Sequence, residues 1–377
     1  MNGTEPALIE DLAAIAASQT KAARFASALG ASGTAAFVSN ATSRVALIRN
    51  KERELPVTID DGGYGRTYVA SPHSAYVLYA RDEIDIVGIR RLRRAAHGAL
   101  DLLDRMLRAI RINQAVHLDN WLLSTNLHGT WDGKGLPQIR EVLTRRFPEH
   151  FLILRSLDPW SCPQLLDAAK ADGWTLLPSR QIWVTENLER DWRPRNDYGN
   201  DRRALAKSGL TVEDLETLGP ADAARIADLY HQLYVGRYSP LNPIFTAQFM
   251  AETARSGLLR YRLARDENGT IMAVAGMLVR GQYLTVPVLG YDLSRPKKDA
   301  LYRIATFMFS DYAMERGLRL HSSSGAGEFK RNRGARPVIE YMAVHAGHLS
   351  LGRRTGLQIL ARLLDTIMVP MMRKQGW

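Results

Sequence analysis

The chain has almost no cysteine. Its 377 residues contain a single one, Cys162, so an intrachain disulfide is excluded, and no cysteine and histidine residues have the spacing of a zinc site. A reducing, cytoplasmic setting is the expectation that follows. Long apolar runs are also missing, since no stretch approaches the roughly 18 uncharged apolar residues of a membrane span. The first residues include Glu5, Glu10 and Asp11, where a secretory signal needs a basic segment. We therefore expect a soluble protein without a transmembrane segment.

Several motifs of common activities are absent as well. The chain has neither the G-x-G-x-x-G turn of dinucleotide-binding folds nor a Walker loop, which disfavours redox chemistry with such cofactors and nucleotide hydrolysis. Ser322, Ser323 and Ser324 lack the G-x-S-x-G elbow of serine hydrolases. No aromatic RNP motif, KH loop or helix-turn-helix signal appears. None of these classes has motif support.

Positive charge, in contrast, is abundant. The chain has 50 Lys and Arg residues against 39 Asp and Glu residues, a formal net charge of +11. This excess favours an anionic partner, although it can equally serve solubility. A long amphipathic helix expected over about 84–112 concentrates arginine on its polar side, which fits either a solvated face or a contact with a nucleic-acid backbone. These arginines are Arg90, Arg91, Arg93, Arg94, Arg105, Arg108 and Arg111.

The length of the chain and the changes in residue pattern along it predict two domains. We expect a helical segment over 1–40 with one helix from Ala7 to about Leu29, a first domain over 41–190, a basic linker or helix over 191–210, a second domain over 211–350 and a C-terminal helix over 351–377. From Arg44 onward the runs RVALI, LPVTI, TYVA and AYVLYA are typical of antiparallel strands. Among them, Tyr68, His73, Tyr76 and Tyr79 either pack in a core or line a substrate pocket.

The second half alternates helices and strands. Helices are expected over about 221–235 and 246–256, followed by the β-like runs LLRYRLARD, IMAVAGMLV and QYLTVPVLGYD. Leu301, Ile304 and Met308 then recur at helical spacing, which predicts a helix over about 296–316. A strand, a glycine-rich basic turn and a second apolar strand come after it. The fold class that we predict is α/β (α+β), a mainly antiparallel mixed sheet flanked by helices.

This order of elements resembles the GNAT superfamily of acyltransferases, and ALYRIATFMFSDYAMERGLRLHSSSGAGEFKRNRGARPVIEYMAVHAGHL resembles the C-terminal signature of its Fem-like branch. The signature has a helix, the pair Arg316-Gly317, a strand, a G-x-x-x-F-K turn that ends at Phe329-Lys330, a glycine at Gly334 and an apolar strand. The basic piece DRRALAKSGLTVEDL precedes it, so the match covers roughly 200–348. The resemblance implies tandem GNAT-like domains and transfer of an acyl group to an amine.

The donor implied by the resemblance depends on the branch. Acetyl-CoA-dependent members carry a Q/R-x-x-G-x-G/A turn before the helix that corresponds to 296–316, whereas this chain has RPKKDAL there, without glycine. We therefore expect no bound cofactor and an aminoacyl-tRNA as co-substrate, with acetyl-CoA or another acyl-CoA as the alternative. A non-catalytic RNA-binding protein on this scaffold is a further alternative. The acceptor amine, a peptidoglycan precursor or a small molecule of natural-product biosynthesis, stays open, as does the oligomeric state.

The candidate catalytic residues lie near the G-x-x-x-F-K turn. By match to that turn Lys330 is expected to stabilise negative charge or hold a phosphate, unless it is a surface lysine. Glu328 is a candidate acceptor for the proton of the amine, or only an ion-pair partner. Tyr291 is a candidate proton donor, or a packed tyrosine at a strand end. His321, His345 and His348 fit a core, a surface or a site equally well.

The candidate binding residues are mostly basic. Arg295, Lys297 and Lys298 precede the predicted helix, where the helix dipole disfavours a cation by about 0.3–1 kcal/mol unless a phosphate binds there. The proposed donor-binding residues are Arg295, Lys297, Lys298, Arg331 and Arg333. The proposed acceptor-binding residues are Arg202, Arg203 and Tyr76, and no metal ligand is expected.

Overall fold

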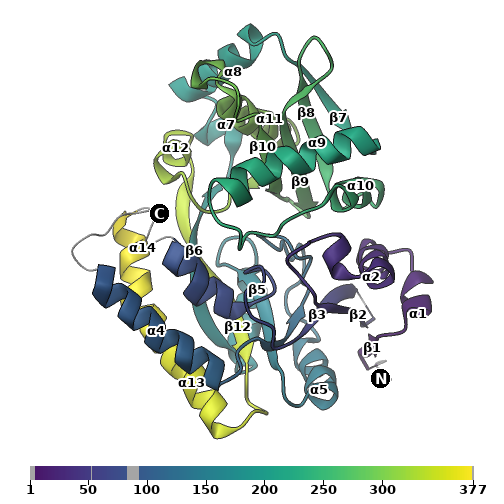
Figure 1. The fold of residues 1–377 in the computed structure, drawn as a ribbon, viewed down its shortest axis with the longest axis vertical. Coiled ribbons are helices and arrows are strands. Elements are labelled where there is room, and N and C mark those ends of the chain that lie inside the picture. Colours follow the sequence, from purple (N-terminus) through teal and green to yellow (C-terminus); the bar gives the residue numbers. More distant parts are fainter. Residues whose placement is uncertain (1–4, 52, 83–92, 376–377) are drawn as a thin grey trace.

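One continuous sheet of twelve strands runs through the whole molecule, with helices on both of its faces (Figure 1). The structure is a computed structural model that describes residues 5–51, 53–82 and 93–375. The fold class predicted from the sequence, a mainly antiparallel mixed sheet flanked by helices, is confirmed.

The first half supplies six strands and the helices around them. They are β1 (Ala7–Ile9), α1 (Leu12–Ala16), α2 (Lys21–Ser32), β2 (Arg44–Arg49), β3 (Glu54–Asp61), β4 (Gln114–Leu118), α5 (Leu136–Arg146), β5 (Phe151–Leu157), α6 (Pro163–Ala171) and β6 (Thr175–Thr185). A π-helical turn, η2 (Ser74–Leu78), and α4 (Arg93–Ala109) lie between β3 and β4. The helices α7 (Leu188–Asp191) and α8 (Asn196–Lys207) lead into the second half.

The second half repeats this order of elements. They are β7 (Thr211–Leu215), α9 (Pro220–Tyr230), α10 (Ala247–Arg255), β8 (Arg260–Arg265), β9 (Ile271–Arg280), β10 (Tyr283–Tyr291), α11 (Leu301–Glu315), β11 (Arg319–His321), α12 (Gly327–Asn332) and β12 (Arg336–His345). A π-helical turn, η3 (His231–Gly236), extends α9. The chain ends in α13 (Leu351–Leu363), η5 (Leu364–Met368) and α14 (Val369–Gln375).

The two halves exchange their last strands at the middle of the sheet. The strand order is β1-β2-β3-β4-β5-β12-β6-β11-β10-β9-β8-β7. Each half contains one parallel pair, β4 with β5 in the first half and β10 with β11 in the second. The next strand beside β5 is β12 of the second half, and the next strand beside β11 is β6 of the first half. The centre of the sheet is therefore the antiparallel pair of β6 and β12, in which Glu340 lies opposite Arg180.

The apolar cores explain why the halves form one body. One cluster combines Phe25 and Trp121 of the first half with Tyr230, Phe249 and Val338 of the second. A second cluster on the same face packs α4 and α13, which lie side by side in Figure 1, against β5, β6 and β12. On the opposite face, α5 and α6 cover the first half and α11 covers the second. The predicted domain limits, with a linker over 191–210, remain a prediction.

Three predictions for the first half are wrong. The expected helix from Ala7 to Leu29 is β1 followed by α1 and α2, because the side chains of Asp11 and Thr20 accept bonds from Ala14 N (2.7 Å) and Ala23 N (3.2 Å) and start new helices. The runs TYVA and AYVLYA are not strands. Ser71 caps Ser74 N (3.0 Å), Pro72 follows it, and AYVLYA is therefore helical.

The signature region of the second half differs from the prediction in two details. The long helix begins at Leu301 rather than near 296, because Ala300 adopts a left-handed conformation (φ 56°) after a 3-10 turn over Lys297–Asp299. The glycine-rich basic segment is not only a turn, since Gly327–Asn332 forms α12. In the first half, α4 accounts for part of the helix predicted over 84–112, and Arg90 and Arg91 lie outside the described residues.

Candidate active site

A buried ion pair occupies the centre of the sheet. Arg180 Nε donates to Glu340 Oε1 (2.8 Å) and Arg180 Nη2 donates to Oε2 (3.2 Å). The same Nη2 also donates to Ser124 O (2.7 Å) and Thr125 Oγ1 (2.8 Å), in the loop that follows β4. Burial alone would lower the pKa of Arg180, but the charge of Glu340 raises it above its ordinary value. The guanidinium is therefore a fixed cation.

A histidine with an unused nitrogen lies beside this pair. His321 is 1% exposed, and its Nδ1 accepts a bond from Ser323 N (3.2 Å). Its Nε2 is 3.8 Å from Glu340 Oε2 and has no hydrogen-bond partner among the described residues. Burial lowers the pKa of His321, so the ring is neutral near pH 7 and its Nε2 carries the proton. A donor without a partner is thus available next to Glu340.

Thr285 adds a second polar atom without a partner at this place. It pairs with His321 in the parallel register of β10 and β11, and its buried Oγ1 lacks a hydrogen-bond partner in the described chain. Buried polar atoms are almost always bonded to protein or to ordered water. Two of them on adjacent strands indicate a position that a polar ligand or water fills.

Lys330 approaches the pair from α12. Its Nζ donates to Ser324 O (2.7 Å), and Ser323 O lies 3.5 Å away. Burial, and then the positive charge of Arg180, lower the pKa of Lys330 to about 7. A sizeable fraction of this amine is therefore neutral at physiological pH. Such a lysine can take up and release a proton, in addition to the role of fixed cation expected from the sequence.

Two tyrosines close the site from the first half. The hydroxyl of Tyr76, in η2, is buried without a partner among the residues described, and burial together with Glu340 raises its pKa. Burial also raises the pKa of Tyr68, whose ring lies 5.3 Å from that of Tyr79. We define the central polar cluster as Arg180, Glu340, His321, Lys330 and Tyr76. It assembles β6, β11, β12, α12 and η2 around the junction of the two halves.

The other two catalytic candidates lie outside the central polar cluster. Tyr291 is half-buried, and its ring contacts Tyr302 (5.8 Å), which contacts Phe329 of α12 (4.8 Å). Glu328 is exposed and lines a shallow pocket of about 400 Å³ beside α8. Among the described residues, no hydrogen bond or ion pair joins either side chain to Arg180 or Glu340, and their catalytic roles stay predictions.

The candidate binding residues are dispersed. Arg333 donates to the buried Asp201 through Nε (2.7 Å) and Nη2 (2.9 Å), and Arg303 binds the same carboxylate (2.7 Å), which ties α12 and α11 to α8. Arg295 pairs with Asp299 (2.9 Å). Lys297 and Lys298 lie in the 3-10 turn before α11, and Arg331 lies over the ring of Trp183 at 5.3 Å.

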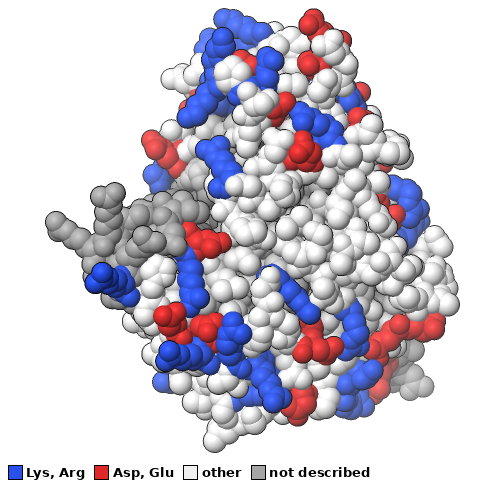
Figure 2. All heavy atoms as spheres, in the orientation of Figure 1, with Lys and Arg blue, Asp and Glu red and all other residues white. Residues whose placement is uncertain are grey.

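The proposed acceptor residues are not brought together. Arg202 and Arg203 are exposed on α8, which packs on α11, whereas Tyr76 is buried in the apolar cluster beneath α4 and α13. Figure 2 shows Lys and Arg side chains gathered at the end of the molecule that carries α7 and α8. The exposed cations of this end, which we call the α7–α8 basic surface, are Arg190, Arg193, Arg195, Arg202, Arg203 and Lys207.

Sequence reasoning missed Arg180 and Glu340. They are 160 residues apart, and only the register of β6 with β12 reveals their contact. It also missed a glycine turn in the first half. Gly133-Lys134-Gly135 precedes α5, the helix that corresponds to α11 by element order, and Gly135 is left-handed (φ 81°). The run TWDGKGLP could have revealed this glycine turn, but it lies outside the region of the family signature.

Comparison with known families agrees with this fold. Residues 193–331 match the family model described as an acetyltransferase (GNAT) domain. The resemblance to GNAT acyltransferases that the sequence predicts is thereby confirmed for these residues. No curated protein matches the chain.

Among solved structures, L-PGS from Bacillus licheniformis is similar at 12% identity and a TM-score of 0.45, over 61% of this chain and 78% of that one. FemX is similar at 10% identity and a TM-score of 0.42, over 62% and 79%. A tandem GNAT protein from the clavulanic acid biosynthesis pathway covers 90% of this chain and 98% of its own length, at 12% identity and a TM-score of 0.38. Likenesses at this level assign no substrate. In the described part of the chain no helix is long and apolar enough to cross a membrane, and no cluster of side chains fits a metal ion.

Proposed function

We propose that the protein is an N-acyltransferase that joins an activated acyl group to an amine at the central polar cluster, with aminoacyl-tRNA as the donor. The observation that carries this proposal is the position of Lys330, whose Nζ donates to Ser324 O (2.7 Å) beside Ser323, the residue that binds His321 Nδ1 through its backbone N–H. The lowered pKa of Lys330 and the unused Nε2–H of His321 support the proposal. Acyl transfer to an amine needs both a base and donors for an oxyanion.

The proposed reaction is aminolysis of an ester. The acceptor amine attacks the ester carbonyl, a C–N bond forms, and negative charge develops on the carbonyl oxygen. His321 Nε2–H and the Arg180 guanidinium stabilise that oxygen, while Glu340 holds the guanidinium in place. Neutral Lys330 takes the proton from the attacking nitrogen. The C–O bond then breaks, and the leaving hydroxyl receives a proton, for which the hydroxyl of Tyr76 is the proposed source.

Charge supports an RNA donor. The α7–α8 basic surface is continuous with exposed Arg331 of α12, the helix that also carries Lys330, because Arg195 donates to Arg331 O (3.3 Å). A polyanion bound along these cations would thus reach the helix of the proposed base. The start of α11 has no glycine to admit a pyrophosphate, and Ala300 holds the left-handed position there.

A second donor class has one observation in its favour. The turn Gly133-Lys134-Gly135 gives α5 a glycine-containing start that α11 lacks, and this is the chemistry that an acyl-CoA pyrophosphate needs. An acyl-CoA-dependent N-acyltransferase is therefore the alternative that we retain, with this turn of the first half as its proposed phosphate site.

One experiment separates these proposals. The purified protein is incubated with charged tRNA, with acetyl-CoA and with a panel of primary amines, and amide products are measured by mass spectrometry. Product formed only with charged tRNA supports the first proposal, and acetylated amine supports the second. Tight RNA binding without turnover of either donor would contradict both, and would favour a non-catalytic RNA-binding protein.

A further inference from the structure

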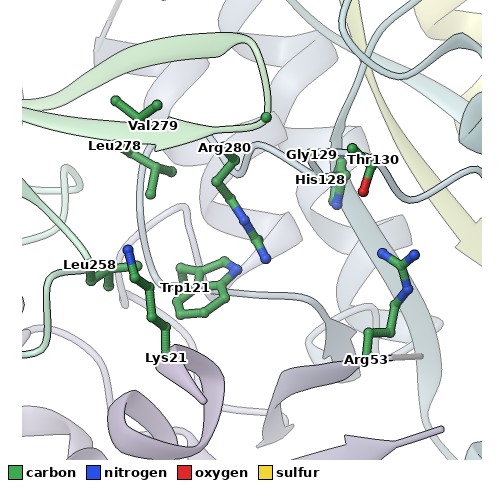
Figure 3. A pocket seen from close by; sticks show the side chains of 11 residues that line it. Lys21, Arg53, Trp121, His128, Gly129, Thr130, Leu258, Leu278, Val279 and Arg280 are labelled. Carbon is green, nitrogen blue, oxygen red and sulfur yellow. The ribbon is translucent and has the colours of Figure 1, made fainter. Parts of the chain in front are cut away.

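A pocket of about 240 Å³ lies where the two halves of the molecule meet, away from the central polar cluster (Figure 3). Its walls come from α2, from the connection between β2 and β3, from the loop before α5 and from the hairpin of β9 and β10. Gly129 of the first half and Gly281 of the second approach each other at its rim, since a Cβ added at Gly281 would lie 3.9 Å from Gly129 Cα. The pocket is thus built by both halves.

Three cationic side chains line this pocket, and each comes from a different element. Lys21 lies on α2, Arg53 precedes β3, and Arg280 ends β9. Lys21 Nζ donates to Gly257 O (2.6 Å), which leaves two of the three ammonium donors unassigned. Figure 3 shows Lys21 and Arg280 on either side of Trp121, with Arg53 beside His128.

Arg53 has a buried hydrogen-bond donor without an acceptor among the described residues. Its guanidinium lies over the ring of Trp131 at 5.7 Å, and its buried Nε has no hydrogen-bond partner among the described residues. A buried charged donor without an acceptor is costly, and an anion in the pocket would satisfy it. Trp131 also fixes the position of the side chain before any ligand arrives.

Acidic side chains neutralise only part of this charge. Arg280 Nη1 lies 3.3 Å from Asp119 Oδ1, and Asp119 is further held by His128 Nδ1 (2.8 Å) and Trp121 Nε1 (2.7 Å). Within residues 5–51, 53–82 and 93–375, no acidic side chain is ion-paired with Lys21 or Arg53. Three positive charges against one carboxylate leave an excess of two. Mutual repulsion is evident at Lys21, whose pKa is lowered by burial and by the charges of Arg260 and Arg280.

We propose that this pocket binds the phosphate monoester of a small ligand, held by Lys21, Arg53 and Arg280. A phosphate monoester carries about −1.5 to −2 charges at pH 7, which matches the excess in the pocket. Arginine binds phosphate through paired N–H donors, and lysine adds a point charge. The volume suits a phosphate with a small organic group, because drug-sized ligands occupy roughly 300 Å³ or more. Thr130 adds an exposed hydroxyl at the mouth, and Leu258 and Leu278 form an apolar wall.

The test is a binding measurement that does not depend on acyl transfer. Isothermal titration calorimetry at low ionic strength uses inorganic phosphate, glycerol 3-phosphate and adenosine 3′,5′-bisphosphate as probes, with glycerol as the neutral control. We expect saturable binding of both phosphate esters and none of glycerol. Tighter binding of the bisphosphate than of glycerol 3-phosphate would identify a nucleotide as the source of the phosphate, and the reverse order would identify a simple phosphate ester.

Variants locate the binding. Arg53→Gln and Lys21→Gln should each raise the Kd for glycerol 3-phosphate by about tenfold, since each removes a charge-assisted bond. Arg145→Gln is the matched control. Arg145 is exposed near the end of α5, does not line the pocket and is not among the charges that shift the pKa of Lys21, so its loss should change the Kd less than about twofold. Arg53→Lys keeps the charge and should restore part of the affinity.

Two results would overturn the proposal. One is the absence of phosphate binding to the native chain, or binding of a short RNA alone. The other is a Kd that is equal in the native chain, in Arg53→Gln and in Lys21→Gln. Thermal unfolding of every variant is recorded beside the titration. If Arg53→Gln does not fold, Lys21→Gln, which removes one hydrogen bond to Gly257 O, decides the question.

Discussion

The helices α5 and α11 hold the same place in the two halves of the molecule but begin differently. α5 starts after Gly135, which has a φ of 81°, and α11 starts after Ala300, which has a φ of 56°. A glycine adopts this conformation without strain, whereas an alanine loses about 1–2 kcal/mol. The first half therefore has an unstrained glycine at this position, whereas in the second half the strained Ala300 follows Arg295, Lys297 and Lys298. Equivalent positions need not have equivalent roles.

The central polar cluster belongs equally to both halves, and the largest expected effect is there. Glu340→Ala would leave Arg180 as a buried charge without its partner, which typically lowers the free energy of unfolding by about 3–5 kcal/mol. Urea unfolding measures this loss. The matched control is Glu189→Ala, which removes an exposed acid paired with Arg193 and should cost about 0–1 kcal/mol. Equal losses in the two variants would contradict the importance of the central pair.

Lys330 belongs to the second half alone and tests whether the chemistry is located there. Lys330→Ala should lower the turnover of the proposed acyl transfer by about 100-fold or more, since general-base catalysis contributes 10²–10⁴-fold. The turnover rate is measured by quenching the reaction at timed intervals and quantifying the amide product, with charged tRNA or acetyl-CoA as the donor. Lys170→Ala, on the exposed face of α6 and outside the α7–α8 basic surface, should leave turnover unchanged. A Lys330→Ala enzyme of unaltered turnover would remove this residue from the mechanism.

The pH dependence sharpens the same point. The pKa of Lys330 is lowered to about 7, and the proposed base is the neutral amine. Turnover should therefore fall about tenfold for each pH unit below this value and level off above it. Single-turnover rates measured between about pH 5.5 and about pH 8.5, roughly 1.5 units on either side of this value, give the apparent pKa. A flat profile would be inconsistent with Lys330 as the base.

The two helix starts can be compared directly by exchange of residues. Ala300→Gly should raise the free energy of unfolding by up to about 1 kcal/mol, because it relieves a left-handed alanine, and Gly135→Ala should lower it by about the same amount. Both changes are followed by thermal and urea unfolding. If the acyl-CoA alternative holds, Gly135→Ala should also weaken acetyl-CoA binding while Ala300→Gly does not. Shifts of the same sign in both variants would break the comparison.

The smallest expected effect concerns the α7–α8 basic surface. Replacing Arg202 and Arg203 together by Gln should weaken tRNA binding by a few-fold and reduce the dependence of log Kd on log salt by about two units, one for each lost phosphate contact. Filter binding between 50 and 200 mM salt, the range over which such contacts respond, measures both. Arg44→Gln, at the exposed start of β2 in the first half, is the control and should leave the slope unchanged.

The sequence predicted those features whose causes are local. The spacing of Leu301, Ile304 and Met308 indicated α11, and the apolar runs indicated β2, β3, β8, β9 and β10. Errors occurred where a short-range signal competed with another, as in the run AYVLYA, which follows the cap at Ser71 and is helical rather than a strand. No pattern in the sequence predicts that β6 and β12 each pair with strands of the other half. Pairing between strands that are distant in the sequence depends on the complete set of available partners.

The same limit applies to the candidate site. Lys330 lies in a motif that the sequence revealed, and it is part of the central polar cluster. The alternation of apolar and polar residues in β11 could not show whether His321 belongs to the core or to the site. Arg180 lies in a strand without a motif, and its partner is known only from the register. Arg333 also lies in the signature region, and its guanidinium is bonded to the buried Asp201. Its predicted role in donor binding stays a prediction.

The exchanged strands also govern the order in which the chain can acquire its structure. β5 remains an open sheet edge until β12 is available, and β12 ends at His345 near the close of the chain. During synthesis the first half must therefore wait, with an unpaired edge, for almost the entire second half to emerge. Completion of the two halves is thus a single late event, because the last strand of each half pairs with the other at the centre of the sheet.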